Sequence, residues 1–302
     1  MRTALDIYTG FFGLRERPFS LVPDPAFLFW SAPHRAAFAM LDYGILTRAP
    51  ITLITGEVGA GKTTLIQHLL ASLGDDVVVG LVSNAQGDRG ELLRWVLMAF
   101  GETAPQGADY VALFARFQAF LIERYAEGRR TILIFDEAQN LSRESLEELR
   151  MLTNINSGKD ELVQLVLVGQ PELRDTIRRP DLVQFAQRVS ASYHLPALDG
   201  RTIQDYVAHR MAVAGAERPV FQHAAVEAIQ AATGGIPRLV NQLCDFALVY
   251  AYSRDEPEVG ADLVRQVLDD GVFFAGGRPP AAIRVLKPRP IRVMDWPLDA
   301  AG

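Results

Sequence analysis

Short runs of apolar and β-branched residues recur along the first two thirds of the chain, and longer helical patterns separate them. The runs that predict strands are Ile51–Thr55, Val77–Val82, Thr131–Phe135, Leu162–Val168 and, more weakly, Val189–Leu195. The helical patterns between them are Lys62–Leu73, Gly90–Phe100, Tyr110–Tyr125 and Ser142–Asn156. Continuous apolar strands that alternate with helices are typical of a parallel sheet covered on both faces. Residues 49–198 are therefore predicted to form an α/β domain around a five-stranded parallel sheet.

After about Asp199 the strand signals stop and only helical periodicity continues. The helical patterns here are Thr202–Val213, His223–Ala232, Pro237–Tyr252 and Ala261–Leu268. Pro237 suits the first turn of a helix, and Gly234–Gly235 suits a helix end. Residues 199–275 are accordingly predicted to form a small, all-helical domain.

The two ends of the chain differ from these domains in composition. Residues 1–48 are rich in large aromatic side chains, and we expect this segment to pack on the core of the α/β domain rather than to extend into solvent. Its aromatic residues are Tyr8, Phe11, Phe12, Phe19, Phe27, Phe29 and Trp30. Residues 276–302 form a Pro-rich tail that we expect to be extended.

The tail carries a local basic patch although the chain as a whole has a formal net charge of −6. Its cations up to Met294 are Arg278, Arg284, Lys287, Arg289 and Arg292, with no acid among them. A solubilising extension is one interpretation. A docking arm for an anionic partner is the other, and a membrane surface, nucleic acid or an acidic protein stay open as that partner. Ile291 and Val293 favour a protein groove or sheet edge, such as one on an envelope or export protein.

The chain lacks the sequence signals of several other protein classes. No apolar run approaches the roughly 20 residues of a membrane-spanning helix, and the first residues lack the apolar run of a signal peptide. Cys244 is the only cysteine, so the chain has no internal disulfide framework. We therefore expect a cytoplasmic protein, with peripheral contact to the inner membrane left open.

The strongest chemical signal is a glycine-rich loop between the first predicted strand and the first predicted helix, with the pattern GxxxxGK[ST]. Its glycines let the backbone turn around phosphate groups, so that backbone N–H groups face the anion. Lys62 is expected to reach the β- and γ-phosphates of ATP, and Thr63 to hold Mg²⁺. The residues predicted to bind the nucleotide here are Gly56, Glu57, Val58, Gly59, Ala60, Gly61, Lys62, Thr63 and Thr64.

Polar residues follow two later strands at the edge where the loop should lie. Asp136 and Glu137 come directly after four apolar residues, and ligands bind at the carboxyl ends of strands in such sheets. Asp136 is expected to orient Mg²⁺, and Glu137 to polarise the water that attacks ATP. Gln170 ends the next strand, where it is a candidate contact to the γ-phosphate or to the attacking water, with a plain loop glutamine as the alternative.

Two arginines are candidates for binding the transferred phosphate, because guanidinium charge near the γ-phosphate assists phosphoryl transfer. Arg188 precedes the fifth strand, and Arg238 begins a helix of the small domain. Arg174, Arg178 and Arg179 compete with Arg188 for this role. The motifs NKxD and LSGGQ, which mark other P-loop classes, do not occur, and the histidines lack metal-ligand spacing, so no metal beyond Mg²⁺ is expected.

In their order along the chain these motifs resemble the ExeA-type AAA+ ATPases (general secretion pathway protein A) and, more loosely, the TniB and MuB ATPases of DNA transposition. The blocks that carry the resemblance are FFGLRERPFSLVPDPAFLFW, GEVGAGKTT, FDEAQ, VLVGQPEL, QRV and GGIPRLVNQLCDFAL. The resemblance covers about Tyr8 to Gly271. It implies the AAA+ fold with a C-terminal lid, homo-oligomeric rings or filaments, and sensor 1, arginine-finger and sensor 2 roles for Gln170, Arg188 and Arg238.

ExeA proteins continue into a membrane helix and a periplasmic part, whereas this chain ends in the basic tail. The expected function is an ATPase that drives assembly or remodelling of a cell-envelope, secretion or exopolysaccharide-export machine. A TniB- or MuB-like regulator that polymerises on DNA is the alternative. A nucleotide-gated adaptor with negligible turnover stays open as a third class.

Overall fold

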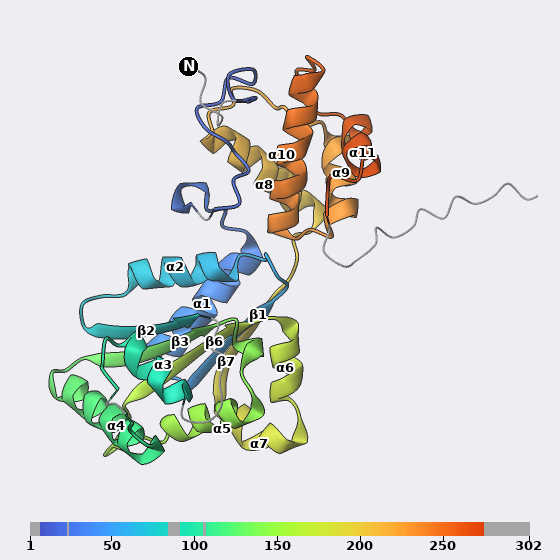
Figure 1. The fold of residues 1–302 in the computed structure, drawn as a ribbon. Helices are drawn as coiled ribbons and strands as arrows, with labels where there is room; N and C mark the ends of the chain where they lie inside the picture. Colours follow the sequence, from blue (N-terminus) through green and yellow to red (C-terminus); the bar gives the residue numbers. More distant parts are fainter. Residues whose placement is uncertain (1–6, 23, 84–90, 105–106, 275–302) are drawn as a thin grey trace, which may run out of the picture.

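The protein consists of an α/β domain and a helical domain, which lie one above the other (Figure 1). The structure is a computed structural model that describes residues 7–22, 24–83, 91–104 and 107–274. The basic tail that we interpret as a docking arm lies outside the described residues. Within the described part, no helix is both long enough and apolar enough to cross a membrane.

The sheet of the α/β domain has five parallel strands in the order β2-β3-β6-β1-β7. The strands are β1 Ile51–Gly56, β2 Val77–Ser83, β3 Arg130–Asp136, β6 Val163–Gly169 and β7 Val189–Leu195. All five were predicted, within a residue or so of these bounds. The three central strands are almost wholly buried, which explains their continuous apolar character.

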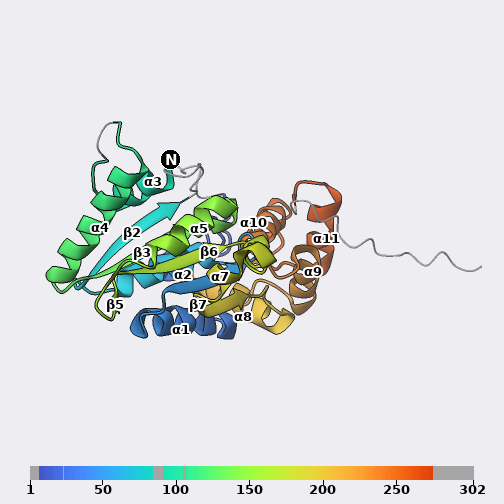
Figure 2. The same cartoon turned by 90° about the horizontal axis from the view of Figure 1, so that it is seen from below.

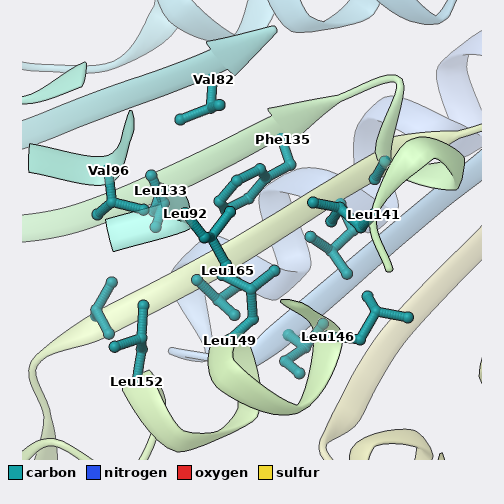
Figure 3. Close-up of a cluster of buried hydrophobic side chains, with 14 of the residues drawn as sticks. Val82, Leu92, Val96, Leu133, Phe135, Leu141, Leu146, Leu149, Leu152 and Leu165 are labelled. Carbon is teal, nitrogen blue, oxygen red and sulfur yellow. The ribbon is translucent and has the colours of Figure 1, made fainter. Parts of the chain in front are cut away.

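Helices cover both faces of this sheet, as Figure 2 shows from below. One face packs against α1 (Ala32–Leu46) and α2 (Lys62–Ser72). The helices on the other face are α3 Glu91–Ala99, α4 Tyr110–Ala126, α5 Arg143–Leu152, α6 Pro171–Ile177 and α7 Val183–Ala186. Figure 3 shows part of the second layer, where Leu133, Phe135 and Leu165 of the strands meet leucines of α5.

The helical domain, called the lid below, packs four helices around its own core of buried side chains. They are α8 Gly200–Val213, α9 His223–Thr233, α10 Pro237–Ser253 and α11 Ala261–Asp269. Gly234 ends α9 with a left-handed φ of 60°, and Pro237 occupies the first turn of α10, as the sequence predicted. All four helices were predicted to within a few residues.

The first segment of the chain packs mainly on the lid, whereas we expected all of residues 1–48 to pack on the core of the α/β domain. Residues 7–22 and 24–29, called the strap, contribute Tyr8, Phe12 and Phe19 to the lid core. Phe29 also meets Tyr206 of α8 edge to face. Of this segment, Trp30 and α1, which follow the strap, pack on the side of the sheet. Aromatic composition predicted that this segment packs, but not on which domain.

Some local elements differ from the sequence prediction. α1, α6 and α7 were not assigned, and α5 ends at Leu152 rather than at Asn156. The chain instead turns into a small hairpin of β4 (Asn156–Ser157) and β5 (Asp160–Glu161). Gly158 adopts a φ of 64° in that turn, a left-handed conformation that glycine tolerates best. Three short 3₁₀ turns complete the described elements, at Pro25–Phe27, Ala138–Asn140 and Pro180–Leu182.

Candidate functional site

The glycine-rich loop connects the end of β1 to the start of α2. Gly59 and Gly61 have φ values of 80° and 100°, in the left-handed region that disfavours other residues. Both also face close neighbours, since a Cβ at Gly59 would lie 2.5 Å from Cβ of Arg238, and one at Gly61 would lie 2.8 Å from Nε2 of His34. The loop therefore needs glycine at both positions to form between α1 and the lid.

Lys62 is enclosed by the loop that precedes it. Its side chain is only 5% exposed, and Nζ donates to the carbonyl oxygens of Gly56 at 2.8 Å and Glu57 at 2.9 Å. Burial lowers the pKa of Lys62, while the nearby carboxylates of Glu137 and Asp136 oppose that shift. These contacts hold the amine inside the loop, where bound phosphate groups would find a fixed positive charge.

Thr63 and Asp136 meet although they are 73 positions apart in the chain. Thr63 Oγ1 donates to Asp136 Oδ2 at 3.1 Å, and the backbone N–H of Glu137 donates to Asp136 Oδ1 at 2.9 Å. Burial raises the pKa of Asp136, while the hydrogen bonds from the Glu137 backbone N–H and the Thr63 hydroxyl oppose that shift. A hydroxyl beside a buried carboxylate is a pair of hard oxygen ligands, and this donor set fits Mg²⁺.

Glu137 and Gln170 are brought together, as the strand-end argument predicted. Glu137 has a left-handed backbone with φ of 56°. Its Oε2 accepts from Gln170 Nε2 at 3.3 Å and from Gln139 Nε2 at 2.6 Å. Gln139 was not predicted as a site residue; its place within the block FDEAQ is the one signal that might have drawn attention to it.

Arg238 brings the lid to the glycine-rich loop. It is the second residue of α10, and its backbone N–H donates to the carbonyl oxygen of Gly59 at 3.2 Å. It lines the same cavity as Lys62, Thr63 and Thr64. The sequence prediction that Arg238 lies near the bound phosphates is compatible with this position.

The cavity beside the loop has a volume of about 240 Å³, and the strap and lid form its other walls. Sequence reasoning gave these residues no role in the site, although Ser20, Leu28 and Asn241 lie within blocks that carry the family resemblance. The strap and lid residues that line it include Ser20, Leu28, Leu198, Tyr206, Arg210 and Asn241.

Arg210 joins strap and lid at this cavity. It is only 7% exposed, and among the described residues no carboxylate pairs with it. Its Nε donates to the carbonyl oxygen of Pro18 at 2.5 Å, its Nη1 donates to Tyr206 Oη at 3.0 Å, and its guanidinium lies 4.9 Å from the ring centroid of Phe27. The Tyr206 hydroxyl in turn donates to Asn241 Oδ1 at 2.7 Å. This network fixes the strap against α8.

His34, to which sequence reasoning gave no role, supports the loop from behind. Its Nε2 lies 3.1 Å from the carbonyl oxygen of Ala60, and its Nδ1 lies 2.6 Å from Ser31 Oγ. Burial lowers the pKa of His34, which favours the neutral ring. The neutral ring then donates from Nε2 to Ala60 and accepts the serine hydroxyl at Nδ1.

Arg188 lies at the opposite end of the sheet from the loop of its own chain. It directly precedes β7, which runs parallel to β1 with Ile51 opposite Val189 and Gly56 opposite Leu195. Its guanidinium donates to the Thr153 carbonyl at 3.3 Å, binds the Asn154 side chain and lies 3.7 Å from Glu161. Arg188 therefore has no access to the cavity of its own chain.

The competing arginines lie elsewhere. Arg174 and Arg178 line a separate hollow beside β7, together with His194. Arg179 forms an ion pair with Asp181 at 3.3 Å. None of the three lines the cavity of the glycine-rich loop.

Comparisons with known proteins show which domain and which relative the chain resembles. Residues 46–177 match the model of an AAA domain. The chain is 38% identical over 277 residues to general secretion pathway protein A of Aeromonas hydrophila, an alignment that covers 89% of this chain and 51% of that protein. The chain thus spans about half the length of this curated relative.

Solved structures share the fold at low sequence identity. ORC2 of Aeropyrum pernix, in ADPNP–ADP complexes, has a TM-score of 0.62 at 21% identity over 84% of this chain and 71% of its own. Cdc6p of Pyrobaculum aerophilum has a TM-score of 0.66 at 18% identity, over 87% of this chain and 74% of its own. The chain accordingly has the AAA+ P-loop fold, carries an AAA domain over residues 46–177, and is related over most of its length to general secretion pathway protein A.

Proposed function

We propose that the chain binds ATP with Mg²⁺ in the cavity between the glycine-rich loop and the lid, and hydrolyses it there. The observation that carries the proposal is the convergence of Lys62, Thr63, Asp136 and Glu137 from separate elements at one edge of the sheet. These groups supply a buried cation, a pair of oxygen ligands and a carboxylate within one site. Phosphoryl transfer needs this combination.

Each residue of the site has a separate proposed role in hydrolysis. Backbone N–H groups of the loop and the Lys62 ammonium bind the phosphate chain. Thr63 and Asp136 would hold Mg²⁺, which when bound neutralises charge on the phosphate oxygens. Glu137 accepts a proton from a water molecule as the water oxygen bonds to the γ-phosphorus and the bond to the ADP oxygen breaks. Gln170 is proposed to orient that water or the γ-phosphate, and Arg238 to contact the phosphates from the lid.

Arg188 is proposed to act on ATP bound by a neighbouring copy of the chain, in a ring or filament. The support is its place at the far end of β7, away from its own cavity and close to the surface. An arginine supplied by a second subunit stabilises negative charge as the γ-phosphate transfers. Arg174, Arg178 and Arg179 stay as alternatives, since none of them lines the cavity of its own chain either.

The biological role proposed is assembly or remodelling of a cell-envelope, secretion or exopolysaccharide-export machine. It is supported by the 38% identity to general secretion pathway protein A. DNA-dependent action is the alternative, and Drosophila ORC bound to DNA shares the fold with a TM-score of 0.64 at 16% identity, over 85% of this chain and 65% of its own. ATPase assays with and without duplex DNA separate the two, since stimulation by DNA alone would favour the alternative.

Glu137→Gln tests the hydrolytic assignment. The variant keeps a side chain of the same size but lacks the proton-accepting carboxylate. We expect ATP affinity to stay within about twofold and turnover to fall by about a hundredfold or more. Turnover within about threefold of the unmodified protein would refute the role of Glu137 as the base.

A further inference from the structure

Gln139 connects the carboxylate of Glu137 to the end of β6. Its Nε2 donates to Glu137 Oε2 at 2.6 Å, and its Oε1 accepts from the backbone N–H of Gln170 at 3.0 Å. An amide carries its donor and its acceptor on separate atoms, so one side chain can bind both groups at once. Gln139 thus links two strand ends whose residues are more than 30 positions apart in the sequence.

The local backbone brings Gln139 to this position. The left-handed turn at Glu137 leads directly into the 3₁₀ turn Ala138–Asn140, which packs against β6 and α6. Gly169 ends β6 without a side chain, and a Cβ there would lie 2.9 Å from Oε1 of Gln139 and 3.2 Å from its backbone nitrogen. The absence of a side chain at Gly169 therefore lets the amide of Gln139 approach the strand end.

The two carboxylate oxygens of Glu137 differ in the hydrogen bonds that they accept. Oε2 accepts from both Gln139 and Gln170, whereas Oε1 accepts no hydrogen bond from the residues that the structure describes. The shorter of the two bonds to Oε2 is the one from Gln139. Fixing Oε2 restricts rotation of the carboxylate and leaves Oε1 as the oxygen that can accept a proton from water.

We propose that Gln139 is a positioning residue for ATP hydrolysis, an inference that rests on the proposed function of Glu137 as the base. Gln139 orients the Glu137 carboxylate through Nε2 and ties it through Oε1 to Gln170.

Two substitutions separate this role from simple packing. Gln139→Leu removes both hydrogen bonds, whereas Gln139→Glu keeps the shape and the acceptor for Gln170 N–H but replaces the donor that faces Glu137. We expect both to lower kcat by about tenfold or more while KM and the affinity for a fluorescent ATP analogue stay within about twofold. Gln118→Leu and Gln118→Glu on the exposed face of α4 are matched controls and should leave all three values unchanged.

The decisive measurement repeats the substitution in a Glu137→Gln background. If Gln139 acts through Glu137, Gln139→Glu should not lower the residual single-turnover rate of that background any further. A further loss of about tenfold there, or a kcat of Gln139→Glu within about threefold of the unmodified protein, would refute the positioning role. If Glu137→Gln does not lower turnover, the proposed function and this inference are both refuted. If Glu137→Gln lowers turnover but substitution of Gln139 does not, only the inference is refuted.

Discussion

Replacing Arg210 with methionine should loosen the strap where it meets α8 and weaken ATP binding. Methionine fills a similar length of apolar space but lacks the guanidinium that binds the Pro18 carbonyl and the Tyr206 hydroxyl. Because strap and lid form walls of the cavity, loss of these bonds acts on the nucleotide site without touching the glycine-rich loop.

The size of the effect follows from the contacts that Arg210 makes. A hydrogen bond from a charged donor to a buried carbonyl contributes about 1.5–3 kcal/mol, and a desolvated cation over an aromatic ring about 1–2 kcal/mol. Removing a buried charge also relieves part of its desolvation cost, which offsets some of the loss. We therefore expect the free energy of unfolding of the lid to fall by about 2–4 kcal/mol.

Urea unfolding and amide hydrogen exchange of the strap and α8 measure this change, and titration with a fluorescent ATP analogue measures affinity. Arg15→Met is the matched control, because exposed Arg15 also donates to a lid carbonyl, that of Val213 at 3.0 Å, and should contribute less than about 1 kcal/mol. A loss in Arg210→Met no larger than in the control, with unchanged exchange in the strap, would refute the reasoning.

Three further predictions concern the site itself. Lys62→Ala should abolish most ATP affinity in equilibrium binding, because it removes the ammonium that the carbonyl oxygens of Gly56 and Glu57 hold inside the loop, and near-native affinity would contradict the phosphate-binding role. Arg188→Ala should bind ATP normally but hydrolyse it poorly, and mixing it with Lys62→Ala should restore part of the activity; mixed oligomers without any recovery would favour Arg174, Arg178 or Arg179. Burial raises the pKa of Asp136 in the folded state, so protonation of this carboxyl favours folding and its ionisation at higher pH disfavours it. Asp136→Asn should therefore raise the melting temperature of the nucleotide-free protein at pH 7, and this gain should vanish as the pH falls into the range where Asp136 is protonated; a gain independent of pH would contradict the burial argument.

Local spacing explains why much of the fold and the phosphate site could be predicted. The glycine-rich loop is a contiguous motif, and its neighbours β1 and α2 follow from a short continuous apolar run and from a hydrophobic pattern of period 3.6. Asp136 and Gln170 could be placed near the loop because parallel strands bring their carboxyl ends to one edge of the sheet.

The features of the fold and the site that were not predicted depend on contacts between residues far apart in the chain, and such contacts leave no periodic pattern in the sequence. The strap reaches the lid through pairs such as Arg210 with the Pro18 carbonyl and Tyr8 with Asp245, which lie about 200 positions or more apart in the chain. Gln139 acquires its partners only through the left-handed turn at Glu137, which a residue pattern does not reveal. The position of Arg188 followed from its strand, but its contacts with Asn154 and Glu161 depend on the small hairpin that was not predicted.

Because the strap belongs to the lid, the chain crosses between lid and sheet at two places. The first crossing joins the strap to α1 near Trp30, and the second joins β7 to α8 between Leu195 and Gly200, as can be followed in Figure 1. Leu28 and Phe29 at the first crossing and Leu198 at the second line the cavity. A change at either crossing therefore acts on the walls of the cavity as well as on the connection between the two domains.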